Sequence, residues 1–444
     1  MINVRRLKEE LLRRNVAVYR AADNAWIPVP IALTPTTVKA AEWSDLERDA
    51  RIILGAFPKI QRWLCDPGRR TLLKRVYEGL TGIEQEVSSL DPEAFWGHAT
   101  IRMDLFWHED AIKVIEVNCT IPAMQAYSDN VLAAWIAAGG KQDSGSNNVG
   151  ELLDSLLGLY RIDGGVLSRP RIAILHRQGD SQLGELLWIQ REWSRIGFET
   201  LLATPETLSR AGDLWLVDGI PCDLVYRHIF AWRLEQSAVS GALMDNRRFH
   251  IYNPPSAHYE SKGFLALLSH LASADDLAKD AGLNADEIRA IRERVPWSRL
   301  LGRLDNAVSF QSVESRLPGL VLKRSIGYGG HQVFMGDAWE SDETQVRLRQ
   351  LTSLVGQISF ATFAAWAETK DTSLWIAQER MSGARRETEV LTASGIETWN
   401  AWYDASIFLN TRSHGVCHGG VSRVATTPVV NIGTGGGLAP FVIY

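Results

Sequence analysis

IRMDLFWHEDAIKVIEVNCTIPA, residues 101–123, decides how this chain is read, because it places acidic residues inside two otherwise ordinary strands. Apolar and polar residues alternate on both sides of a charged tip at residues 108–110, which predicts a β-hairpin. With the turn centred on residue 110, Asp104 lies directly opposite Glu116. Two carboxylates that face each other across a ladder, with Cβ atoms about 5 Å apart, destabilise a sheet unless they are neutralised. A divalent cation beside the two acids would neutralise them.

Arg102 and Asn118 share the face of the hairpin that carries the two acids, because side chains at i and i+2 point the same way in a strand. The carboxylates and the amide carbonyl of Asp104, Glu116 and Asn118 are hard oxygen donors that suit magnesium. Arg102 beside them would hold a phosphate through two parallel hydrogen bonds. Two other interpretations remain open: a surface hairpin with scattered polar residues, and one carboxylate paired only with Arg102.

The size and charge of the chain indicate how many domains it has and exclude some kinds of binding partner. The chain has 444 residues, of which 45% are hydrophobic and 22% charged, so it buries a large core and divides into two or three domains. With a formal net charge of −5, the chain lacks the excess of positive charge that would attract nucleic acid or an anionic membrane. No apolar run reaches the roughly 18 residues of a membrane span. We therefore expect no nucleic acid and no membrane among its partners.

The N-terminus and the cysteines indicate the compartment. Residues 1–19 place Val4, Leu7 and Leu11 on one face of an amphipathic helix and lack the apolar core of a signal peptide. The four cysteines are scattered without CxxC spacing, which is typical of reduced thiols and not of a zinc site or a disulfide framework. These features predict a cytoplasmic protein.

Three regions follow one another along the chain. Residues 1–150 are expected to form a helical region that carries the hairpin. Over residues 151–290 buried strands alternate with helices, as in RIAILH (171–176) and SQLGELLWIQREWSRIGF (181–198), which predicts a Rossmann-like α/β layer. No GxGxxG turn follows the first of these strands, so no dinucleotide site is expected. Residues 291–444 turn to strands joined by glycine-rich turns, and the predicted fold class is α/β (α+β).

The segment GLVLKRSIGYGGHQVFMG, residues 319–336, reads as strand, glycine-rich turn and strand. Gly327, Gly329 and Gly330 let the backbone approach a ligand and expose N–H groups, which suits a phosphate. Lys323, on the strand that enters the turn, would add a point charge. The segment lacks GK[ST] and a following helix, so it is not a Walker loop. It resembles the hairpin lid that covers ATP in kinases and ATP-grasp enzymes, and a purely structural turn is the alternative.

Two later strands carry polar residues of interest. SLWIAQERM (373–381) is an apolar strand that ends in Gln378 and Glu379. An apolar strand whose backbone meets adenine, followed by an acid for the ribose hydroxyls, is a common nucleotide arrangement. Arg423 lies on a strand-like SRVA between pairs of glycines, where a functional and a structural arginine are both open.

The order of these elements resembles that of the circularly permuted ATP-grasp ligases, in particular the type 2 group and the fold of glutathionylspermidine synthase. The last third of the chain supplies a lysine strand, a glycine lid, an adenine strand and an arginine strand, and the hairpin comes from near the N-terminus. The segments that carry the resemblance are RMD (102–104) with EVN (116–118), VPWSRLL (295–301), LKRSIGYGG (322–330), AQER (377–380) and GGVSRVA (419–425). The chain departs from the family at the first nucleotide lysine, where Arg299 or Arg303 lies roughly in its place.

This resemblance implies a circularly permuted ATP-grasp fold with a Rossmann-like pre-ATP-grasp domain. It implies a ligase that activates a small-molecule carboxylate with ATP as an acyl phosphate and joins it to an amine, releasing ADP and phosphate. ATP and two magnesium ions are the implied cofactors. The implied site residues are Arg102 and Arg423 for catalysis, Lys323, Gly327, Gly329, Gly330, Gln378 and Glu379 for ATP, and Asp104, Glu116 and Asn118 for the metal.

Five residues are candidates for contact with the carboxylate or amine substrate. They are Gln125, Tyr127, Asp129, Arg227 and Lys262, of which the last two would bind a carboxylate. A loop that caps the next helix is the competing interpretation of the first three. For Arg227 and Lys262 it is a solvated or salt-bridged surface residue. Two other functions remain open: a phosphotransferase that uses the same ATP site on a small molecule, and a nucleotide-binding regulatory subunit without turnover.

Overall fold

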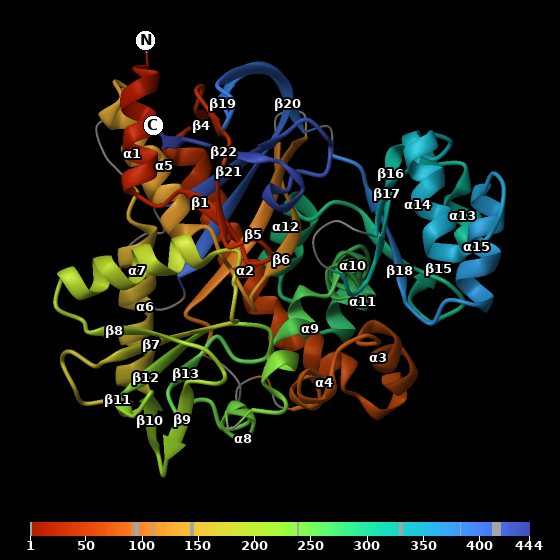
Figure 1. Ribbon diagram of the computed structural model, residues 1–444. Coiled ribbons are helices and arrows are strands. Elements are labelled where there is room, and N and C mark those ends of the chain that lie inside the picture. Colours follow the sequence, from red (N-terminus) through yellow and green to blue (C-terminus); the bar gives the residue numbers. More distant parts are fainter. Residues whose placement is uncertain are drawn as a thin grey trace.

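A computed structural model describes residues 2–90, 92, 97–108, 111–142, 146–237, 239–327, 332–381, 383–410 and 419–444. Three large sheets, with helices packed around them, organise this part of the chain (Figure 1). The hairpin tip at Glu109-Asp110 and two of the expected lid glycines, Gly329 and Gly330, lie outside the described residues.

The largest sheet joins segments from both ends of the chain. Its seven strands, in spatial order, are β19 (Ala384–Leu391), β3 (Ile31–Ala32), β22 (Gly437–Ala439), β21 (Gly420–Ala425), β20 (Ile396–Asn410), β5 (Thr100–His108) and β6 (Ala111–Asn118). The long strand β20 pairs antiparallel with β5 on one side and with β21 on the other. The second half of β20 is fully buried, because helices and neighbouring strands cover it on both faces. The sequence-predicted hairpin therefore lies directly beside strands from the end of the chain.

The hairpin formed by β5 and β6 has the predicted register where the polar residues lie. Asp104 pairs with Glu116 and Arg102 pairs with Asn118, which confirms the expected pairing. Toward the tip the register shifts by one residue, so that Leu105 pairs with Val114 and an extra residue, at position 115, forms a bulge. The single register expected from the alternation is therefore wrong for the half of the hairpin near the tip. A bulge inserts a residue that local alternation does not reveal.

The second sheet consists of four parallel strands. In spatial order they are β13 (Ile251–Tyr252), β12 (Leu224–His228), β7 (Ile172–His176) and β8 (Thr200–Ala203). Helix α7 (Leu183–Arg195) connects β7 to β8, and its apolar residues pack with those of α6 (Asn148–Ile162) against the sheet. All five residues of β7 are buried, which is the pattern of a central parallel strand covered on both faces. The strand and helix expected at residues 171–198 are thus both present.

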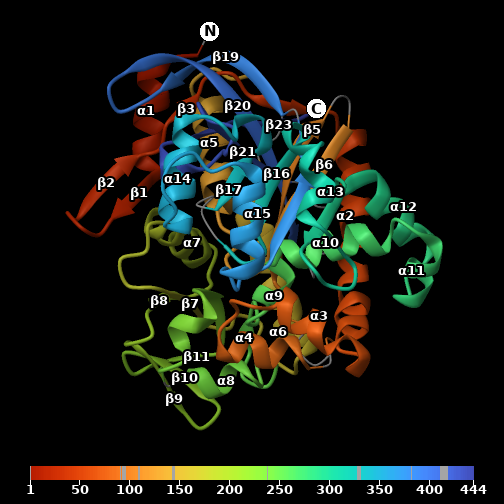
Figure 2. The same ribbon diagram turned by 90° about the vertical axis from the view of Figure 1, so that its right-hand side faces the viewer.

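The third sheet carries the strands of the expected lid. In spatial order they are β15 (Ala307–Val308), β14 (Ser298–Leu301), β18 (Trp375–Glu379), β16 (Leu320–Arg324) and β17 (Val333–Met335). Three helices gather on this sheet in both views: α13 (Phe310–Glu314), α14 (Asp342–Thr352) and α15 (Phe360–Thr369) (Figures 1 and 2). The sequence analysis had expected only strands and turns in this region.

The remaining strands form three small sheets. They pair β1 (Ala17–Arg20) with β2 (Ala25–Pro28), β10 (Leu214–Val217) with β9 (Leu208–Ala211) and β11 (Ile220–Cys222), and β4 (Thr36–Val38) with β23 (Phe441–Ile443). The N-terminal 150 residues therefore contain strands as well as the expected helices.

The other α-helices cover the sheets and the space between them. They are α1 (Val4–Arg13), α2 (Ala40–Leu64), α3 (Arg70–Val76), α4 (Gly82–Ser88), α5 (Gln125–Ala137), α8 (Ser240–Leu243), α9 (Ala257–Glu260), α10 (Lys262–Leu271), α11 (Asp275–Asp280) and α12 (Ala285–Arg294). Helix α1 buries Leu7 and Leu11, which confirms the amphipathic N-terminal helix. Among the described residues, no helix has both the length and the apolar character needed to cross a membrane.

Candidate active site

The three large sheets meet around a cleft with a volume of about 440 Å³. The hairpin β5–β6, the strands β16–β18 and the loops that follow β7 and β12 all line it. Nine of the residues expected at the site from the sequence lie in this cleft: Arg102, Asp104, Glu116, Asn118, Lys323, Gly327, Gln378, Glu379 and Arg423. Residues that are far apart in the chain, such as Asp104 and Lys323, therefore share one cleft.

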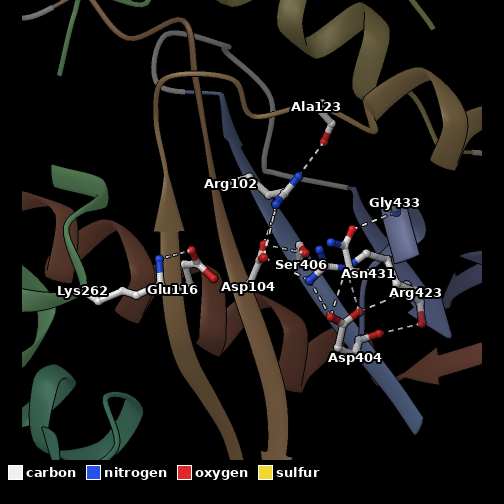
Figure 3. A network of polar contacts seen from close by, with 11 residues as sticks. Arg102, Asp104, Glu116, Ala123, Lys262, Asp404, Ser406, Arg423, Asn431 and Gly433 are labelled. Atoms are coloured by element: carbon white, nitrogen blue, oxygen red, sulfur yellow. Dashed lines mark hydrogen bonds and ion pairs between the residues drawn. The ribbon is translucent and has the colours of Figure 1, made fainter. Parts of the chain in front are cut away.

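Asp104 lies at the centre of a buried polar network (Figure 3). Its Oδ1 accepts hydrogen bonds from Arg102 Nε at 2.7 Å and from Ser406 Oγ at 2.9 Å, and its Oδ2 accepts from Arg102 Nη2 at 3.2 Å and from Arg423 Nη2 at 3.0 Å. Burial alone would raise the pKa of Asp104, but the charges of Arg102 and Arg423 hold it well below its ordinary value. The carboxylate is ionised, and the four hydrogen bonds use its acceptor positions.

Arg423 is held from its other side by Asp404, which lies directly opposite it on β20. Arg423 Nε donates to Asp404 Oδ2 at 3.0 Å, and its backbone N–H donates to Oδ1 at 3.1 Å. Burial raises the pKa of Asp404 to about 6, against the opposing effect of Arg423. Burial lowers the pKa of Arg423, but Asp104 and Asp404 more than reverse this and raise it above its ordinary value. The guanidinium is therefore charged and fixed between two carboxylates.

Glu116 is paired with a lysine from another part of the chain. Lys262, the first residue of α10, places Nζ 2.9 Å from Glu116 Oε1 and donates to the backbone oxygen of Gly327 at 2.8 Å. The Glu116 side chain is 28% exposed to the cleft. Nδ2 of the neighbouring Asn118 is buried and has no hydrogen-bond partner within the described part of the chain. Lys262 thus connects the acidic hairpin to the beginning of the glycine-rich turn.

Lys323 is the second lysine of the cleft. It is 7% exposed on β16, and its Nζ donates to Gln378 Oε1 on the adjacent strand β18 at 2.7 Å. Gln378 Nε2 in turn donates to Ser298 Oγ at 3.2 Å, which fixes the orientation of the amide. Burial lowers the pKa of Lys323 to about 8, and Glu116 partly offsets this effect. The neutral amide of Gln378 thus holds the amine of Lys323 in position within the cleft.

The walls of the cleft differ in character from one end to the other. Next to the lysines, strands β16 and β17 and the segment after β18 contribute the apolar side chains of Val321, Val333, Met335 and Met381. The loops after β7 and β12 contribute the basic and aromatic side chains of Arg177, Phe230, Trp232 and Arg233. Two chemically different ends thus flank the polar network.

The cleft is also more positive than the chain as a whole. Eight arginine and lysine side chains and five aspartate and glutamate side chains line it, a surplus of three positive charges, whereas the whole chain has a formal net charge of −5. A concave site with this balance attracts anionic ligands. A ligand with several negative charges suits it best.

Gln125 and Tyr127, two of the candidates for substrate contact, do not line the cleft. Both are buried in α5, where Gln125 Nε2 donates to Thr100 Oγ1 at 2.9 Å and the Tyr127 hydroxyl donates to the backbone oxygen of Ala17 at 2.7 Å. These contacts connect α5 to its neighbours.

Asp129 and Arg227, two further substrate candidates, also lie away from the cleft. Asp129 accepts hydrogen bonds from the backbone N–H groups of Asn148 and Val149, at 3.1 and 3.0 Å, and so caps the start of α6. Arg227 is fully buried and donates to three backbone oxygens, among them that of Pro254 at 2.6 Å. Asp129 and Arg227 therefore make structural contacts. For Asp129 the competing interpretation, in which it caps the next helix, is correct.

Neither arginine considered for the first nucleotide lysine lines the cleft. Arg299 lies over the ring of Trp297, and Arg303 pairs with Glu368. Lys262, which the sequence analysis considered only for the carboxylate substrate, does line the cleft and supplies the additional cation beside Glu116. No local pattern places it there, because it approaches Glu116 only through the packing of α10.

Asp404 is another residue of the network that the sequence analysis missed. A signal was present, since Asp404 is a single acid within the strand pattern WNAWYDASIFL (399–409), as Asp104 is within its own strand. An acid on a buried strand needs a partner, and on this strand the partner is Arg423.

The oxygen donors of the hairpin fit a magnesium ion that arrives with phosphate groups. Within the described residues Glu116 Oε2 has no hydrogen-bond partner and is available as a ligand. The unpaired atom of Asn118 is the amide nitrogen, a donor that suits a phosphate oxygen, so Asn118 would reach the ion only through its carbonyl oxygen. Asp104 would become a ligand only by giving up one of the hydrogen bonds that it accepts from Arg102, Arg423 and Ser406. No group of three His, Cys, Asp or Glu side chains in the described chain is arranged to hold a metal by itself. Magnesium commonly binds through one or two carboxylates together with substrate phosphates, so this donor set is sufficient.

Comparison with known proteins places the fold. No protein-family model and no curated protein matches the sequence. Among solved structures, a glutathione synthetase-like effector from Globodera pallida, determined in its apo form, superposes with a TM-score of 0.55 at 14% identity, covering 97% of this chain and 89% of its own. A protein from Methylobacillus flagellatus, provisionally named gamma-glutamylcysteine synthetase, covers 90% of this chain and 85% of its own at 12% identity, with a TM-score of only 0.39. The first of these likenesses shows that the chain has a mixed α/β fold similar to that of the glutathione synthetase-like effector.

Proposed function

We propose that this protein is an ATP- and magnesium-dependent carboxylate–amine ligase with a circularly permuted ATP-grasp fold. The observation that carries the proposal is that Asp104 and Glu116, from the early hairpin, share one positively charged cleft with Lys323, from the late glycine-rich segment. The sheet that joins early strands to late strands supports the permuted order. The four parallel strands would form the Rossmann-like layer beside it. The glutathione synthetase-like fold is compatible with this activity, although a fold by itself does not define a reaction.

The nucleotide would occupy the end of the cleft formed by β16, β17 and β18. Apolar side chains on these strands suit the adenine ring, and Glu379 at the end of β18 suits the ribose hydroxyls. Lys323 and Lys262 would contact the phosphates, as would the backbone N–H of Gly327, which lines the cleft. A triphosphate matches the positive surplus of the cleft, because it brings several negative charges to one place.

The metal would bind where the hairpin faces these phosphates. Glu116 and Asn118 have unused polar atoms there, and Asp104 lies beside them. Magnesium, when bound, offsets the charge that develops on the transferring phosphoryl group. Lys262 would then be free to exchange its ion pair with Glu116 for a contact with phosphate.

Two arginines would stabilise the acyl phosphate. In the first step a carboxylate oxygen of the substrate attacks the γ-phosphorus and the bond to ADP breaks. In the second step an amine nitrogen attacks the carbonyl carbon, the carbon–oxygen bond to phosphate breaks, and the nitrogen loses a proton. Arg102 and Arg423 are held rigidly by Asp104 and Asp404, so they can stabilise the negative oxygens in both steps without reorganising.

A second candidate function is nucleotide binding without turnover. The specific observation in its favour is that both oxygens of Asp104 are already engaged by arginines and Ser406. Such a carboxylate is less available as a metal ligand. A phosphotransferase would bind its nucleotide at the same end of the cleft. Its product, a phosphorylated acceptor, distinguishes it from a ligase.

A screen for ADP release tests these functions. Amino acids, small peptides and polyamines are offered in pairs with Mg·ATP, and products are identified by mass spectrometry. A ligase yields an amide with free phosphate, a phosphotransferase yields a phosphorylated acceptor, and a binding protein yields neither while still binding ATP.

Variants of the two acids then test the site. We expect Asp104→Asn and Glu116→Gln each to lower turnover about ten-fold or more, because each removes a negative charge that would hold magnesium beside the phosphates. Full ADP-forming ligation by either variant at ordinary magnesium concentration would rule out the metal assignment.

A further inference from the structure

The end of the cleft away from β16–β18 is formed by two loops that leave the parallel sheet at the same edge. Strands β7 and β12 are parallel neighbours, with His176 paired to His228 at their last residues. The segments that follow them contribute Arg177, Ile229, Phe230, Trp232 and Arg233 to the lining of the cleft. Ligands of parallel α/β sheets bind beyond the carboxyl ends of the strands, which is where these loops lie.

Aromatic rings form one side of this end. The rings of Phe230 and Trp232 are nearly parallel, with an interplanar angle of 19° and centroids 6.5 Å apart. Trp232 is 42% exposed, although an indole is among the most costly side chains to leave in water. An exposed indole in a cleft offers a flat apolar surface on which a planar group of a ligand can stack.

A positively charged group lies beside these rings. The guanidinium carbon of Arg233 is 4.2 Å from the centroid of the Trp232 ring. Within the described residues Arg233 makes no ion pair, whereas Arg177 places Nε 3.7 Å from Asp180 Oδ2. A guanidinium is planar, so when its face stacks on an indole its N–H edge stays free for a carboxylate.

This end of the cleft is linked to the buried polar network. Apolar side chains of Ile121, Met124 and Ile229 line the same cleft as the two sets of residues. Arg102, which binds Asp104, also donates to the backbone oxygen of Ala123 at 3.1 Å, one residue before Met124. A ligand seated on Trp232 and Arg233 would therefore extend along an apolar strip toward the residues proposed for catalysis.

From this geometry we propose that the protein takes an aromatic amino acid, or a short peptide ending in one, as its amine substrate. The ring stacks on Trp232, and the carboxylate binds Arg233 with help from Arg177. The amine remains free to be acylated. The inference rests on the proposed ligase function for the role of the amine but not for the binding itself.

Ligand-observed NMR tests the binding step, with Mg·AMP-PNP present throughout. The probes are L-phenylalanine, phenethylamine, which lacks the carboxylate, and L-alanine, which lacks the ring. L-phenylalanine should bind about ten-fold more tightly than either. If it binds no better than the other two, the inference is wrong.

Variants locate the binding in the cleft. Trp232→Ala and Arg233→Ala should each weaken L-phenylalanine binding about five-fold or more, and Trp232→Phe should retain most of it because the ring remains. Arg191→Ala is the matched control, since Arg191 also lies over a tryptophan, Trp188 at 3.8 Å, but does not line the cleft. Undiminished binding by both alanine variants would overturn the proposal.

A separate titration of AMP-PNP keeps the two proposals apart. If the nucleotide binds and L-phenylalanine does not, this inference fails and the proposed nucleotide site stands. If L-phenylalanine binds and the nucleotide does not, the proposed function fails and the aromatic subsite stands.

Discussion

Because Lys323 is buried, its protonation depends on the charge of a bound ligand. Its amine is 7% exposed and donates to Gln378, a neutral partner. Burial lowers its pKa to about 8, so the charged form is only moderately favoured at neutral pH. A bound polyanion favours the charged form, and the protonation of Lys323 and the binding of phosphate therefore reinforce each other.

We predict that Lys323→Met weakens the binding of Mg·ATP about ten-fold or more, since a hydrogen bond to a charged group contributes roughly 1.5–3 kcal/mol. Calorimetric titration between pH 7 and pH 9 checks this. In the unsubstituted protein the affinity should fall above about pH 8, as the lysine loses its proton, and this fall should be smaller in the variant. Lys279→Met, on the exposed helix α11, is the control and should bind normally. Equal affinity of the two variants would contradict the role of Lys323.

Glu260 is a buried acid whose function is structural. Its Oε1 accepts hydrogen bonds from the backbone N–H groups of Cys119, at 2.7 Å, and Thr120, directly after the hairpin. Burial raises the pKa of Glu260 to about 7. The folded protein therefore keeps this proton over a pH range in which the unfolded chain has lost it.

The consequence is a loss of stability as pH rises. Between about pH 4.5 and pH 7 the unfolded state loses the Glu260 proton first, which lowers the free energy of unfolding by roughly 3 kcal/mol across that window. We predict that Glu260→Gln removes this contribution, because the amide cannot ionise but its oxygen still accepts the two hydrogen bonds. Urea denaturation at pH 5 and pH 7.5 measures the difference. Glu9→Gln, in an exposed ion pair of α1, should leave the pH dependence unchanged.

At the scale of elements, one helix supplies the cap of the next. Asp129 of α5 accepts hydrogen bonds from Asn148 and Val149, the first two residues of α6, and also from the Asn148 side chain at 2.9 Å. Burial raises the pKa of Asp129 to about 6, which reflects the cost of enclosing its charge. The capping contacts compensate for this cost because they satisfy N–H groups that a helix start leaves unpaired.

Asp129→Ala should therefore reduce stability and leave nucleotide binding intact. We expect the free energy of unfolding to fall by about 2 kcal/mol, since three donors near α6 lose their acceptor. Asp129→Asn should cost less, because an amide oxygen remains. Thermal unfolding and an AMP-PNP titration measure the two effects, and a large loss of nucleotide affinity in the alanine variant would place Asp129 in the site after all.

The elements differ in how well the sequence predicted them. The hairpin, α1 and α7 follow from local alternation or helical periodicity, and all three are present. The bulge in β6 and the helices α14 and α15 were missed. A bulge depends on how the partner strand lies, and α15 carries apolar residues on several sides, so its pattern lacks a clear polar face.

At the scale of the whole molecule, the cleft depends on three sheets being held together. The hairpin β5–β6 belongs to the seven-stranded sheet, and strands β16 and β17 belong to the five-stranded sheet. The loop that carries Phe230 and Trp232 follows β12 of the four-stranded parallel sheet. A ligand that bridges the first two would stabilise their packing, because it binds the folded state and not the unfolded chain.

We therefore predict that Mg·AMP-PNP at about 100 times its dissociation constant raises the melting temperature by several degrees, corresponding to about 2.7 kcal/mol of stabilisation. Differential scanning fluorimetry measures the shift. Lys323→Met should abolish most of it at the same concentration. An unchanged melting temperature in the unsubstituted protein would mean that the cleft does not bind the nucleotide.

The sequence alone determined the features that arise between near neighbours. The polar face with Asp104 and Glu116 follows from alternation within one hairpin, and closing a short loop costs little entropy. Only the tertiary structure decided which charges, beyond Arg102, neutralise these acids. Arg423 reaches Asp104 because β21 and β5 pair with opposite edges of β20 in one sheet, and Lys262 reaches Glu116 because α10 lies beside the hairpin. Such partners come from distant parts of the chain, so local pattern does not reveal them.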